Sequence, residues 1–455
     1  MKVCKFGGSS LADGERVKQV CDIVLGDPER RVVVVSAPGK RFSGDTKVTD
    51  LLMACAGASL GGASAKDELK AVSDRFEAIC DCLGLPVEVM ESICGDLEAR
   101  LKITRRSDAH FMDAMKAAGE ANSGRMVAAE LARRGVKARY LDPQDAGMLL
   151  SDEYGNAAVL DETYANLASI AEYDGITVFP GFFGYTRNGD LVTFPRGGSD
   201  ITGSILAVAV GAEVYENFTD VDSVYAADPR IIECARRISR ITFREMRELS
   251  YAGFAVLHDE AVIPAVRAGI PICIKNTANP DGEGTMVLSR REHESGRAVG
   301  IAGAGGFCTV FVEKYLMNRE IGFGRRLLQI FEEEGLSYEH APSGIDNMSI
   351  ILRENQFTAE MESHVVQRIR SEMSADDVEV EHGLGIVMVV GEGLRYALGM
   401  SAKAAGALAG AGINIEMINQ GASEISMMFG VKGEDCDSAV RSLYKAFFED
   451  PERSA

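Results

Sequence analysis

The chain has 455 residues, a length that accommodates two to four domains of ordinary size. Hydrophobic residues make up 46% and charged residues 25% of the sequence, as in ordinary soluble globular proteins. The formal net charge of −20 predicts a surface that repels nucleic acid and anionic membranes, so neither is expected as a partner. The start of the chain lacks the apolar core of a signal peptide, and the longest apolar stretch is shorter than the roughly 20 residues of a membrane span. We therefore expect a cytoplasmic protein.

Short β-branched runs alternate with longer helical patterns over roughly the first 290 residues. The predicted strands are 32–36, 139–141, 176–179, 213–216 and 272–274. Alternation of this kind predicts an α/β fold with a central, mainly parallel sheet between helices. Ligands in such folds bind beyond the carboxyl ends of the strands, so the loops that follow strands are where we expect the chemistry.

The first motif, Lys5-Phe6-Gly7-Gly8-Ser9-Ser10, follows a short strand pattern. Its two glycines let the backbone approach a ligand closely, and successive N–H groups at a helix start can hold phosphate oxygens. Lys5 would add positive charge where negative charge builds up during phosphoryl transfer. The motif is not a Walker A loop, and no Gly-x-Gly-x-x-Gly occurs in the chain. Taken alone, it is explained as well by a tight turn with a surface lysine.

The second motif is Phe194-Pro195-Arg196-Gly197-Gly198-Ser199-Asp200. The Arg196 guanidinium suits bidentate capture of a carboxylate, and the two glycines again permit close approach of the backbone. Asp200 could bind an ammonium group or orient Lys5, and the upstream segment 180–184 would supply an apolar wall. The alternative interpretation is a hairpin followed by a helix over 202–210.

The third motif spans 217–230 and follows the strand predicted at 213–216. Thr219 and Asp220 could meet a ribose, a base or a metal-bound phosphate, and Arg230 offers charge for a triphosphate. Acidic loops also serve as solvated helix caps, which is the alternative interpretation here.

The C-terminal third contains an internal repeat. The segment 279–306, rich in glycine and charge, is typical of a domain boundary. Beyond it, one gap-free offset of 77 positions aligns five pairs of identical residues: Gly322 with Gly399, Gly335 with Gly412, Glu339 with Glu416, Gly344 with Gly421 and Ser349 with Ser426. The offset predicts two copies of one small strand–helix–strand–strand unit.

In this order and spacing, the motifs resemble those of the aspartate kinase (aspartokinase) family, within the amino acid kinase superfamily, over essentially the whole chain. The matching blocks are 5–10, Val33-Val34-Val35-Ser36-Ala37, Val48-Thr49-Asp50-Leu51-Leu52, Gly119-Glu120, 196–200, Thr219-Asp220-Val221-Asp222 and Ala227-Asp228-Pro229-Arg230. The repeat resembles the paired ACT domains of that family, with 412–415 and 423–426 characteristic of the second copy. The resemblance implies an amino acid kinase fold over 1–295 and two α+β ACT domains at 305–380 and 381–455.

The resemblance implies ATP-dependent phosphorylation of the side-chain carboxylate of L-aspartate to 4-phospho-L-aspartate, the first step of lysine, threonine and methionine biosynthesis. Mg²⁺ would accompany ATP. Lys5 and Asp200 would be catalytic, while Glu120 would hold the substrate α-ammonium and Arg196 its α-carboxylate. The implied substrate site is Ser36, Thr49, Glu120, Phe182, Arg196, Gly197, Gly198 and Ser199. The implied nucleotide site is Lys5, Gly7, Gly8, Ser9, Thr219, Asp220, Tyr225 and Arg230.

The ACT resemblance implies regulation by an amino-acid effector. We expect lysine, with threonine as a second candidate, because an acidic pair could hold a cationic side chain. The implied effector residues are Met317, Glu339, Ser343, Asp346 and Asn414. ACT units commonly pair across subunits, so we expect a homodimer or a dimer of dimers.

Some positions depart from the family pattern. Ala255 stands where many relatives carry a lysine and Asp259 stands in place of a proline, while Pro195 and Ser223 replace glycines. The change at Ala255 leaves one nucleotide contact of the family open.

Two other functions fit parts of the sequence. Another superfamily member could act on glutamate, acetylglutamate or a nucleotide, and the paired C-terminal repeat argues against it. A catalytically silent amino-acid sensor is the second, and the intact set of Lys5, Glu120, Arg196 and Asp200 argues against that.

Overall fold

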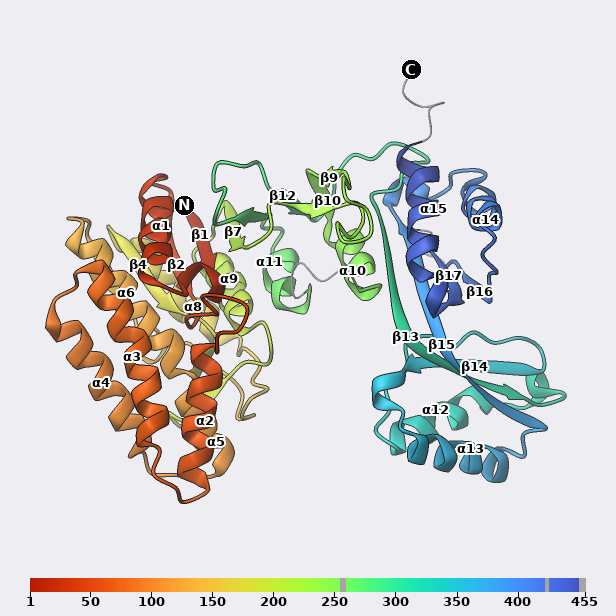
Figure 1. Cartoon of the computed structure of the whole chain (residues 1–455), viewed down its shortest axis with the longest axis horizontal. Coiled ribbons are helices and arrows are strands. Elements are labelled where there is room, and N and C mark those ends of the chain that lie inside the picture. Colours follow the sequence, from red (N-terminus) through yellow and green to blue (C-terminus); the bar gives the residue numbers. More distant parts are fainter. Residues whose placement is uncertain (254–258, 422–424, 450–455) are drawn as a thin grey trace. The chain divides into compact units, whose positions relative to one another are not determined.

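The computed structural model describes residues 1–253, 259–421 and 425–449 (Figure 1). Ala255 and residues 423–424 of the second repeat therefore lie outside the described residues. The chain forms two compact units, the first made of 1–224, 238–243 and 256–291, and the second of 225–237, 244–255 and 292–455. Within the described ranges, no helix combines the length and the apolar character that crossing a bilayer requires.

The first unit is built on an eight-stranded sheet with the strand order β10-β12-β11-β7-β1-β2-β4-β3. Its strands are β1 (Lys2–Phe6), β2 (Arg30–Val35), β3 (Ala138–Tyr140), β4 (Ile176–Pro180), β7 (Val214–Thr219), β10 (Arg240–Thr242), β11 (Ile272–Asn276) and β12 (Thr285–Leu288). Every neighbouring pair is parallel except β11–β12. The predicted mainly parallel sheet is confirmed, and β12 is a strand inside the segment that the sequence marks only as a boundary.

Helices cover both faces of this sheet. They are α1 (Gly14–Leu25), α2 (Val48–Leu60), α3 (Lys66–Leu83), α4 (Val87–Leu101), α5 (Asp108–Lys116), α6 (Ala118–Arg133), α7 (Pro143–Ala146), α8 (Glu162–Leu167), α9 (Gly198–Ala209) and α11 (Ile263–Arg267). Side chains alternate along a strand, so neighbouring residues of β1 face opposite sides. Phe6 packs in one core with Val17 and Val20 of α1, whereas Lys5 faces α9. A hairpin of β5 (Phe183–Tyr185) and β6 (Leu191–Thr193) precedes α9.

The second unit carries a five-stranded antiparallel sheet with the order β14-β13-β15-β17-β16. Its strands are β13 (Gly300–Glu313), β14 (Asn347–Arg353), β15 (Asp377–Val390), β16 (Met417–Asn419) and β17 (Ser426–Lys432), and its helices are α10 (Phe243–Tyr251), α12 (Phe323–Glu333), α13 (Ala359–Met373), α14 (Met400–Gly410) and α15 (Cys436–Phe448). Helices α12 and α14 begin and end at the predicted offset of 77, and α13 and α15 begin at it. Gly322 and Gly399 precede α12 and α14 with φ of 79° and 82°, a conformation that favours glycine.

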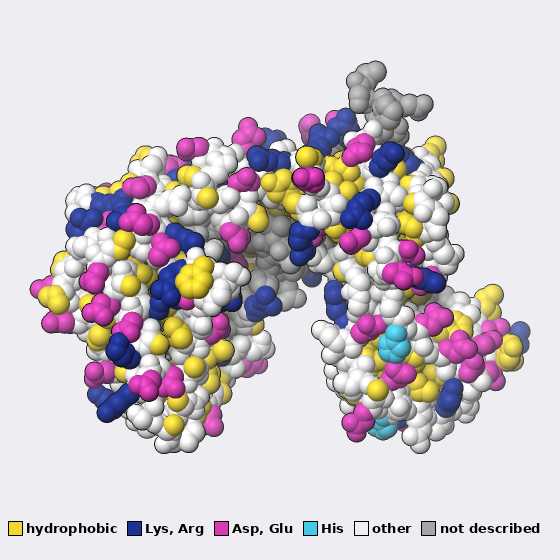
Figure 2. Space-filling view, in the orientation of Figure 1, with side chains coloured by type: hydrophobic (Ala, Val, Ile, Leu, Met, Phe, Trp, Pro, Cys, Tyr) yellow, Lys and Arg dark blue, Asp and Glu magenta, His cyan; other side chains and the backbone are white. Residues whose placement is uncertain are grey.

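The two copies share their longest strands. Residues 307–313 of β13 pair with β14 and with the start of β15. Residues 300–304 of β13 pair instead with 386–390 of β15, which also pair with β17. Residues 300–304 of β13, which precede the first copy at 305–380, therefore complete the sheet of the second copy. On the face shown in Figure 2, acidic side chains are distributed over both units with Lys and Arg between them.

A buried ion pair joins two strands of the first unit. Arg30 Nε donates to Glu216 Oε2 at 2.6 Å and Nη2 donates to Oε1 at 3.2 Å, while Nη1 donates to the Ile23 carbonyl at 2.6 Å. The two side chains are 9% and 5% exposed. Each charge is compensated almost entirely by the other, because little water reaches them.

We predict that Glu216→Ala lowers the free energy of unfolding by about 3–5 kcal/mol, since it leaves a buried guanidinium without a counter-charge. Urea unfolding followed by circular dichroism measures the change. The double variant Arg30→Met/Glu216→Leu should recover most of the loss, because no charge then remains buried. Lys70→Ala, which breaks an ion pair whose partners are 71% and 52% exposed, should leave the midpoint unchanged. A loss below about 1 kcal/mol in the single variant would contradict this account.

Candidate active site

The ammonium group of Lys5 lies against two side chains from other elements of the first unit. Lys5 Nζ on β1 lies 2.7 Å from Asp200 Oδ1 on α9 and donates to Asn217 Oδ1 on β7 at 3.5 Å. Asn217 Nδ2 donates to Asp200 Oδ1 at 2.8 Å, which closes the triangle. All three side chains are buried. Lys5 and Asn217 are register partners on adjacent parallel strands, so their side chains emerge on the same face.

The glycine motif touches the loop that follows β2. Gly39 N donates to the Gly8 carbonyl at 2.8 Å. A Cβ on Gly8 would lie 2.8 Å from the Ala37 carbonyl oxygen, and a Cβ on Gly39 would lie 2.6 Å from the Gly8 carbonyl carbon. Glycine is therefore required at both positions, because the two backbones are in contact. The N–H groups of Gly8 and Ser9 start a short 3₁₀ helix, and the described residues offer them no acceptor. Such donors suit phosphate oxygens.

A cavity of about 560 Å³ opens beside this contact. Its lining residues are Gly8, Ser9, Ser36, Ala37, Pro38, Gly39, Lys40, Phe42, Ser43, Lys47, Thr49, Glu120 and Asp220. Six of the residues predicted for the substrate and nucleotide sites are therefore among them: Gly8, Ser9, Ser36, Thr49, Glu120 and Asp220. Neither Gly7 nor Lys5 is among the lining residues, but Gly7 precedes Gly8 and a Cβ on it would be 3.7 Å from Lys5 Nζ.

Glu120 is a buried carboxyl group at the edge of this cavity. It lies in the first turn of α6 and is 6% exposed. Burial raises its pKa from 4.5 to about 8, opposed by backbone N–H groups of Ala37 and of Glu120 itself. Oε2 has no hydrogen-bond partner among the described residues. Gly119 lets the helix approach the loop, because a Cβ there would lie 2.6 Å from Ala37 Cβ. An ammonium group in the cavity would supply the missing counter-charge.

The second motif is packed around the start of α9. Phe182 has a positive φ of 78°, a conformation that costs of order 1–3 kcal/mol outside glycine. Its backbone is held there because its N–H donates to Thr202 Oγ1 at 3.0 Å and its carbonyl accepts from Phe194 N at 2.9 Å. A Cβ on Gly198 would lie 2.6 Å from the Phe182 ring, and one on Gly181 2.6 Å from Ser199 Oγ. The hairpin and a helix exist, which confirms the structural interpretation of this motif, with the helix beginning at Gly198; the functional interpretation stays a prediction.

The remaining residues of this motif differ in their surroundings. Arg196 is exposed and forms no ion pair with the described residues. It precedes the same helix whose Asp200 pairs with Lys5. The guanidinium is thus available to a ligand anion, although Arg196, Gly197, Gly198 and Ser199 are not among the residues that line the cavity.

Two of the predicted nucleotide residues belong to the second unit. These are Tyr225 and Arg230, and Arg230 is ion-paired with Asp228 at 2.5 Å. Within the first unit, the Thr219 hydroxyl donates to Asp220 at 3.1 Å. The grouping of Tyr225 and Arg230 with the other nucleotide residues stays a prediction.

Only some of the predicted effector residues lie close together. Met317 is buried in a short 3₁₀ turn, and Asp346 Oδ1 accepts from the preceding Leu316 N at 2.8 Å. Ser343 lines a separate cavity of about 520 Å³ on the sheet. Glu339 instead pairs with Arg353 Nε at 3.2 Å, and Asn414 is exposed.

Two parts of the site were not predicted from the sequence. Asn217 opens the third motif, and its role depends on the register between β1 and β7, which no local pattern reveals. Lys40, Phe42, Ser43 and Lys47 line the cavity from a loop without regular structure. The only signal for them was three cations, Lys40, Arg41 and Lys47, between two matching blocks.

The residues of the site suit a metal ion that is bound to a nucleotide. The part of the chain that the structure describes has no group of three or more His, Cys, Asp or Glu placed to bind a metal ion. Mg²⁺ bound to a nucleotide uses only one or two protein carboxylates, because phosphates and water supply the other oxygens. Asp220, which lines the cavity, suits that role.

Comparisons with known proteins match both units. Residues 1–276 match the model of the amino acid kinase family, and residues 387–447 match that of an ACT domain. The sequence is 55% identical to aspartokinase 3 of Bacillus subtilis, over 98% of this chain and 99% of that protein.

Solved structures agree with this match. The crystal structure of aspartate kinase from Clostridium acetobutylicum has a TM-score of 0.88 and 37% identity, and the match covers 98% of this chain and 100% of that one. Aspartokinase III of Escherichia coli, solved with aspartate and ADP in an R-state and with lysine and aspartate in a T-state, gives TM-scores of 0.75 and 0.76 at 28% identity. Those matches cover 98% of this chain and 100% and 99% of those chains. With the same folds present from end to end, the chain belongs to the aspartokinase family.

Proposed function

We propose that this chain transfers the γ-phosphoryl group of ATP to the side-chain carboxylate of L-aspartate, releasing ADP and 4-phospho-L-aspartate. The observation that carries the proposal is the buried Lys5–Asp200–Asn217 triangle beside the glycine motif and a polar cavity. The product would be the entry to lysine, threonine and methionine synthesis, and the cytoplasm is the proposed location of the enzyme.

Phosphoryl transfer requires little covalent help from a protein, so positioning and charge neutralisation carry the catalysis. Lys5 Nζ would lie between the γ-phosphate and the acceptor carboxylate, and Asp200 and Asn217 would hold it there. The N–H groups of Gly8 and Ser9, which have no acceptor among the described residues, would bind phosphate oxygens. Mg²⁺, carried by ATP and met by Asp220, would neutralise further phosphate charge.

The acceptor would be fixed by charges at both of its ends. Glu120 would bind the α-ammonium, because its buried Oε2 has no partner among the described residues. Arg196 would bind the α-carboxylate through its unpaired guanidinium, and Ser36 and Thr49 would hold the substrate from the loop side. Amino acids without a second carboxylate could bind by the same contacts but would offer no acceptor.

We predict that Lys5→Met lowers kcat by on the order of 10²–10³ while changing the KM for aspartate much less, because the lysine acts on charge that develops in the transition state. The measurement traps the acyl phosphate with hydroxylamine and reads the hydroxamate as its iron(III) complex. Lys2→Met is the matched control, since Lys2 lies on the same strand but pairs with Asp27 at 2.6 Å. Full turnover by Lys5→Met would overturn the proposal, and hydroxamate formed from glutamate rather than aspartate would reassign the substrate.

The raised pKa of Glu120 predicts a pH dependence of aspartate binding. Below pH 8 the free enzyme holds this carboxyl protonated, so binding the ammonium must first release a proton. The KM for aspartate should therefore fall as the pH rises toward about 8, by up to tenfold per unit, and then level off. Glu120→Gln should raise that KM and remove the dependence. An unchanged pH profile in Glu120→Gln would exclude this role, and the KM for ATP is the internal control.

We further propose feedback inhibition by lysine through the ACT units, in a homodimer or dimer of dimers. The support is the acidic Asp346 beside Met317 and the Escherichia coli relative solved with lysine. Asp346→Asn keeps the oxygen that accepts from Leu316 N but removes the charge, so we predict a roughly ten- to hundredfold higher lysine concentration for half-inhibition. The hydroxamate assay with lysine, and separately with threonine, measures it. Unchanged wild-type activity at saturating lysine would exclude lysine as the effector.

A further inference from the structure

The loop between β2 and α2 forms one wall of the cavity. Its residues Lys40, Phe42, Ser43 and Lys47 line the cavity although residues 40–44 are exposed and belong to no helix or strand. Ser36 and Thr49, the two hydroxyl residues proposed to hold aspartate, lie just outside its two ends. This 39–46 loop joins the end of β2, which Ser36 follows, to the start of α2, which carries Thr49.

One buried guanidinium binds both ends of the loop. Arg75 on α3 donates to the Gly39 carbonyl at 2.8 Å, to the Thr46 carbonyl at 3.0 Å and to Asp45 Oδ2 at 2.9 Å. A fourth hydrogen bond, at 3.3 Å, reaches the carbonyl of Ala12, which follows the 3₁₀ helix that begins in the glycine motif. The Arg75 and Asp45 side chains are 7% and 8% exposed. Because a guanidinium is planar and rigid, these acceptors are held in one relative geometry.

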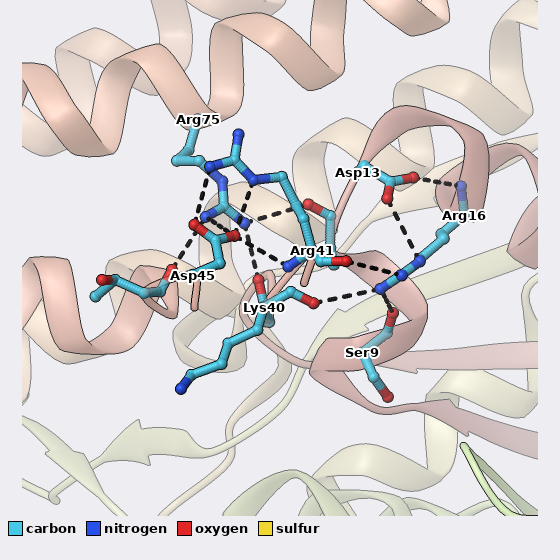
Figure 3. Close-up of polar contacts among 10 residues, drawn as sticks. Ser9, Asp13, Arg16, Lys40, Arg41, Asp45 and Arg75 are labelled. Carbon is cyan, nitrogen blue, oxygen red and sulfur yellow. Dashed lines mark hydrogen bonds and ion pairs between the residues drawn. The ribbon is translucent and has the colours of Figure 1, made fainter. Parts of the chain in front are cut away.

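Asp45 also closes the loop on itself. Its carboxylate accepts from Arg41 Nε at 2.8 Å, from Arg41 Nη2 at 2.9 Å and from the Arg41 backbone N at 3.0 Å. These bonds to Arg41, with the nearby Arg75 charge, hold the pKa of Asp45 well below its ordinary value. Figure 3 shows the Arg41 and Arg75 guanidinium groups meeting at this carboxylate.

A second guanidinium ties the loop to the glycine motif. Arg16 on α1 donates to the Ser9 carbonyl at 2.9 Å, to the Lys40 carbonyl at 3.3 Å and to the Arg41 carbonyl at 3.2 Å. Asp13 supports it from the helix cap, with Oδ2 at 3.4 Å from Arg16 Nε. In Figure 3 the Lys40 ammonium group points away from all of these contacts, and the described residues give it no partner.

We infer that Arg75 and Arg16 are positioning residues that hold the 39–46 loop in its substrate-binding conformation, and thereby set the affinity for the amino-acid substrate. We call these two residues with Asp45 the guanidinium clamp. The inference rests on the proposed function, because the loop acts on aspartate through Ser36 and Thr49. Arg75 is not among the residues that line the cavity, so we assign it a positioning role and not a catalytic one. Loss of the clamp frees the loop without removing a group that takes part in the reaction.

The test compares Arg75→Met and Asp45→Asn with Arg30→Met. Arg30 is an equally buried arginine with a carboxylate partner, 9% exposed, but it sits at the start of β2, at the opposite end of the strand from the loop. Arg75→Met and Asp45→Asn should each raise the KM for aspartate on the order of ten- to a hundredfold, with kcat and the KM for ATP changed by less than about threefold. Arg30→Met should lower thermal stability and leave the KM for aspartate unchanged. The double variant Arg75→Met/Asp45→Asn should cost no more than either single change, because both break one unit.

A second readout does not depend on activity. Trypsin should cut after Lys40 and Arg41 faster in Arg75→Met than in the wild type, and saturating aspartate should slow that cleavage, as mass spectrometry of the fragments will show. Arg75→Lys keeps the charge but not the planar fork, so it should rescue only in part. If Arg75→Met does not fold, Asp45→Asn and Arg16→Met carry the test, the latter on a side chain that is 38% exposed. Arg16→Met should raise the KM for aspartate and for ATP together, since it also releases Ser9.

The outcomes separate this inference from the proposed function. A wild-type chain that forms no hydroxamate overturns the proposed function and this inference with it. An active wild type whose clamp variants keep the wild-type KM for aspartate, or lose stability in parallel with Arg30→Met without a change in KM, overturns the inference alone.

Discussion

An ammonium group on a central strand can be buried only where opposite charge and hydrogen-bond acceptors surround it. Lys5 meets that condition through Asp200 on α9 and Asn217 on β7, residues about two hundred positions later in the chain. The parallel order β7-β1-β2 is what brings them together, because it aligns the carboxyl ends of three strands that are distant in sequence. The cavity opens at this same edge, so a ligand placed there would lie beside a charge that is already oriented.

Close backbone contact is the second constraint on the site. Gly8 and Gly39 touch, and Gly119 allows α6 to bring Glu120 against the same loop. Three segments therefore pack closely at these glycines. Among the described residues, Glu120 Oε2 and the N–H groups of Gly8 and Ser9 beside this contact have no hydrogen-bond partner, so they can bind a ligand in the cavity. The glycines thus determine the cavity as much as the charged residues do.

The second unit consists of two small copies that share strands. Each copy of the repeat is too small to bury a large core alone, and the long strands β13 and β15 run through both copies. These two strands pair on both sides of an irregularity at residues 304–309, so backbone hydrogen bonds of the same pair of strands belong to both copies. This arrangement suits a unit that responds as a whole to a bound effector.

Local sequence patterns predicted many of the strands and helices of this protein, and the motifs of its candidate site. The β-branched runs predicted β2, β3, β4, β7 and β11, because strands buried on both faces consist of continuous apolar residues. The offset of 77 predicted two copies of one unit, and helices α12 and α14 begin and end at that spacing. The motifs around Lys5, Glu120 and Asp200 indicated the chemistry, since few residue types can hold phosphate and carboxylate groups.

Other features depend on tertiary structure alone. The partnership of Lys5 with Asn217 depends on strand register, the completion of the second copy by residues 300–304 depends on a non-local pairing, and the role of Arg75 depends on a loop that lies thirty residues before it. None of these contacts leaves a periodic signal, because each joins residues whose spacing along the chain is arbitrary.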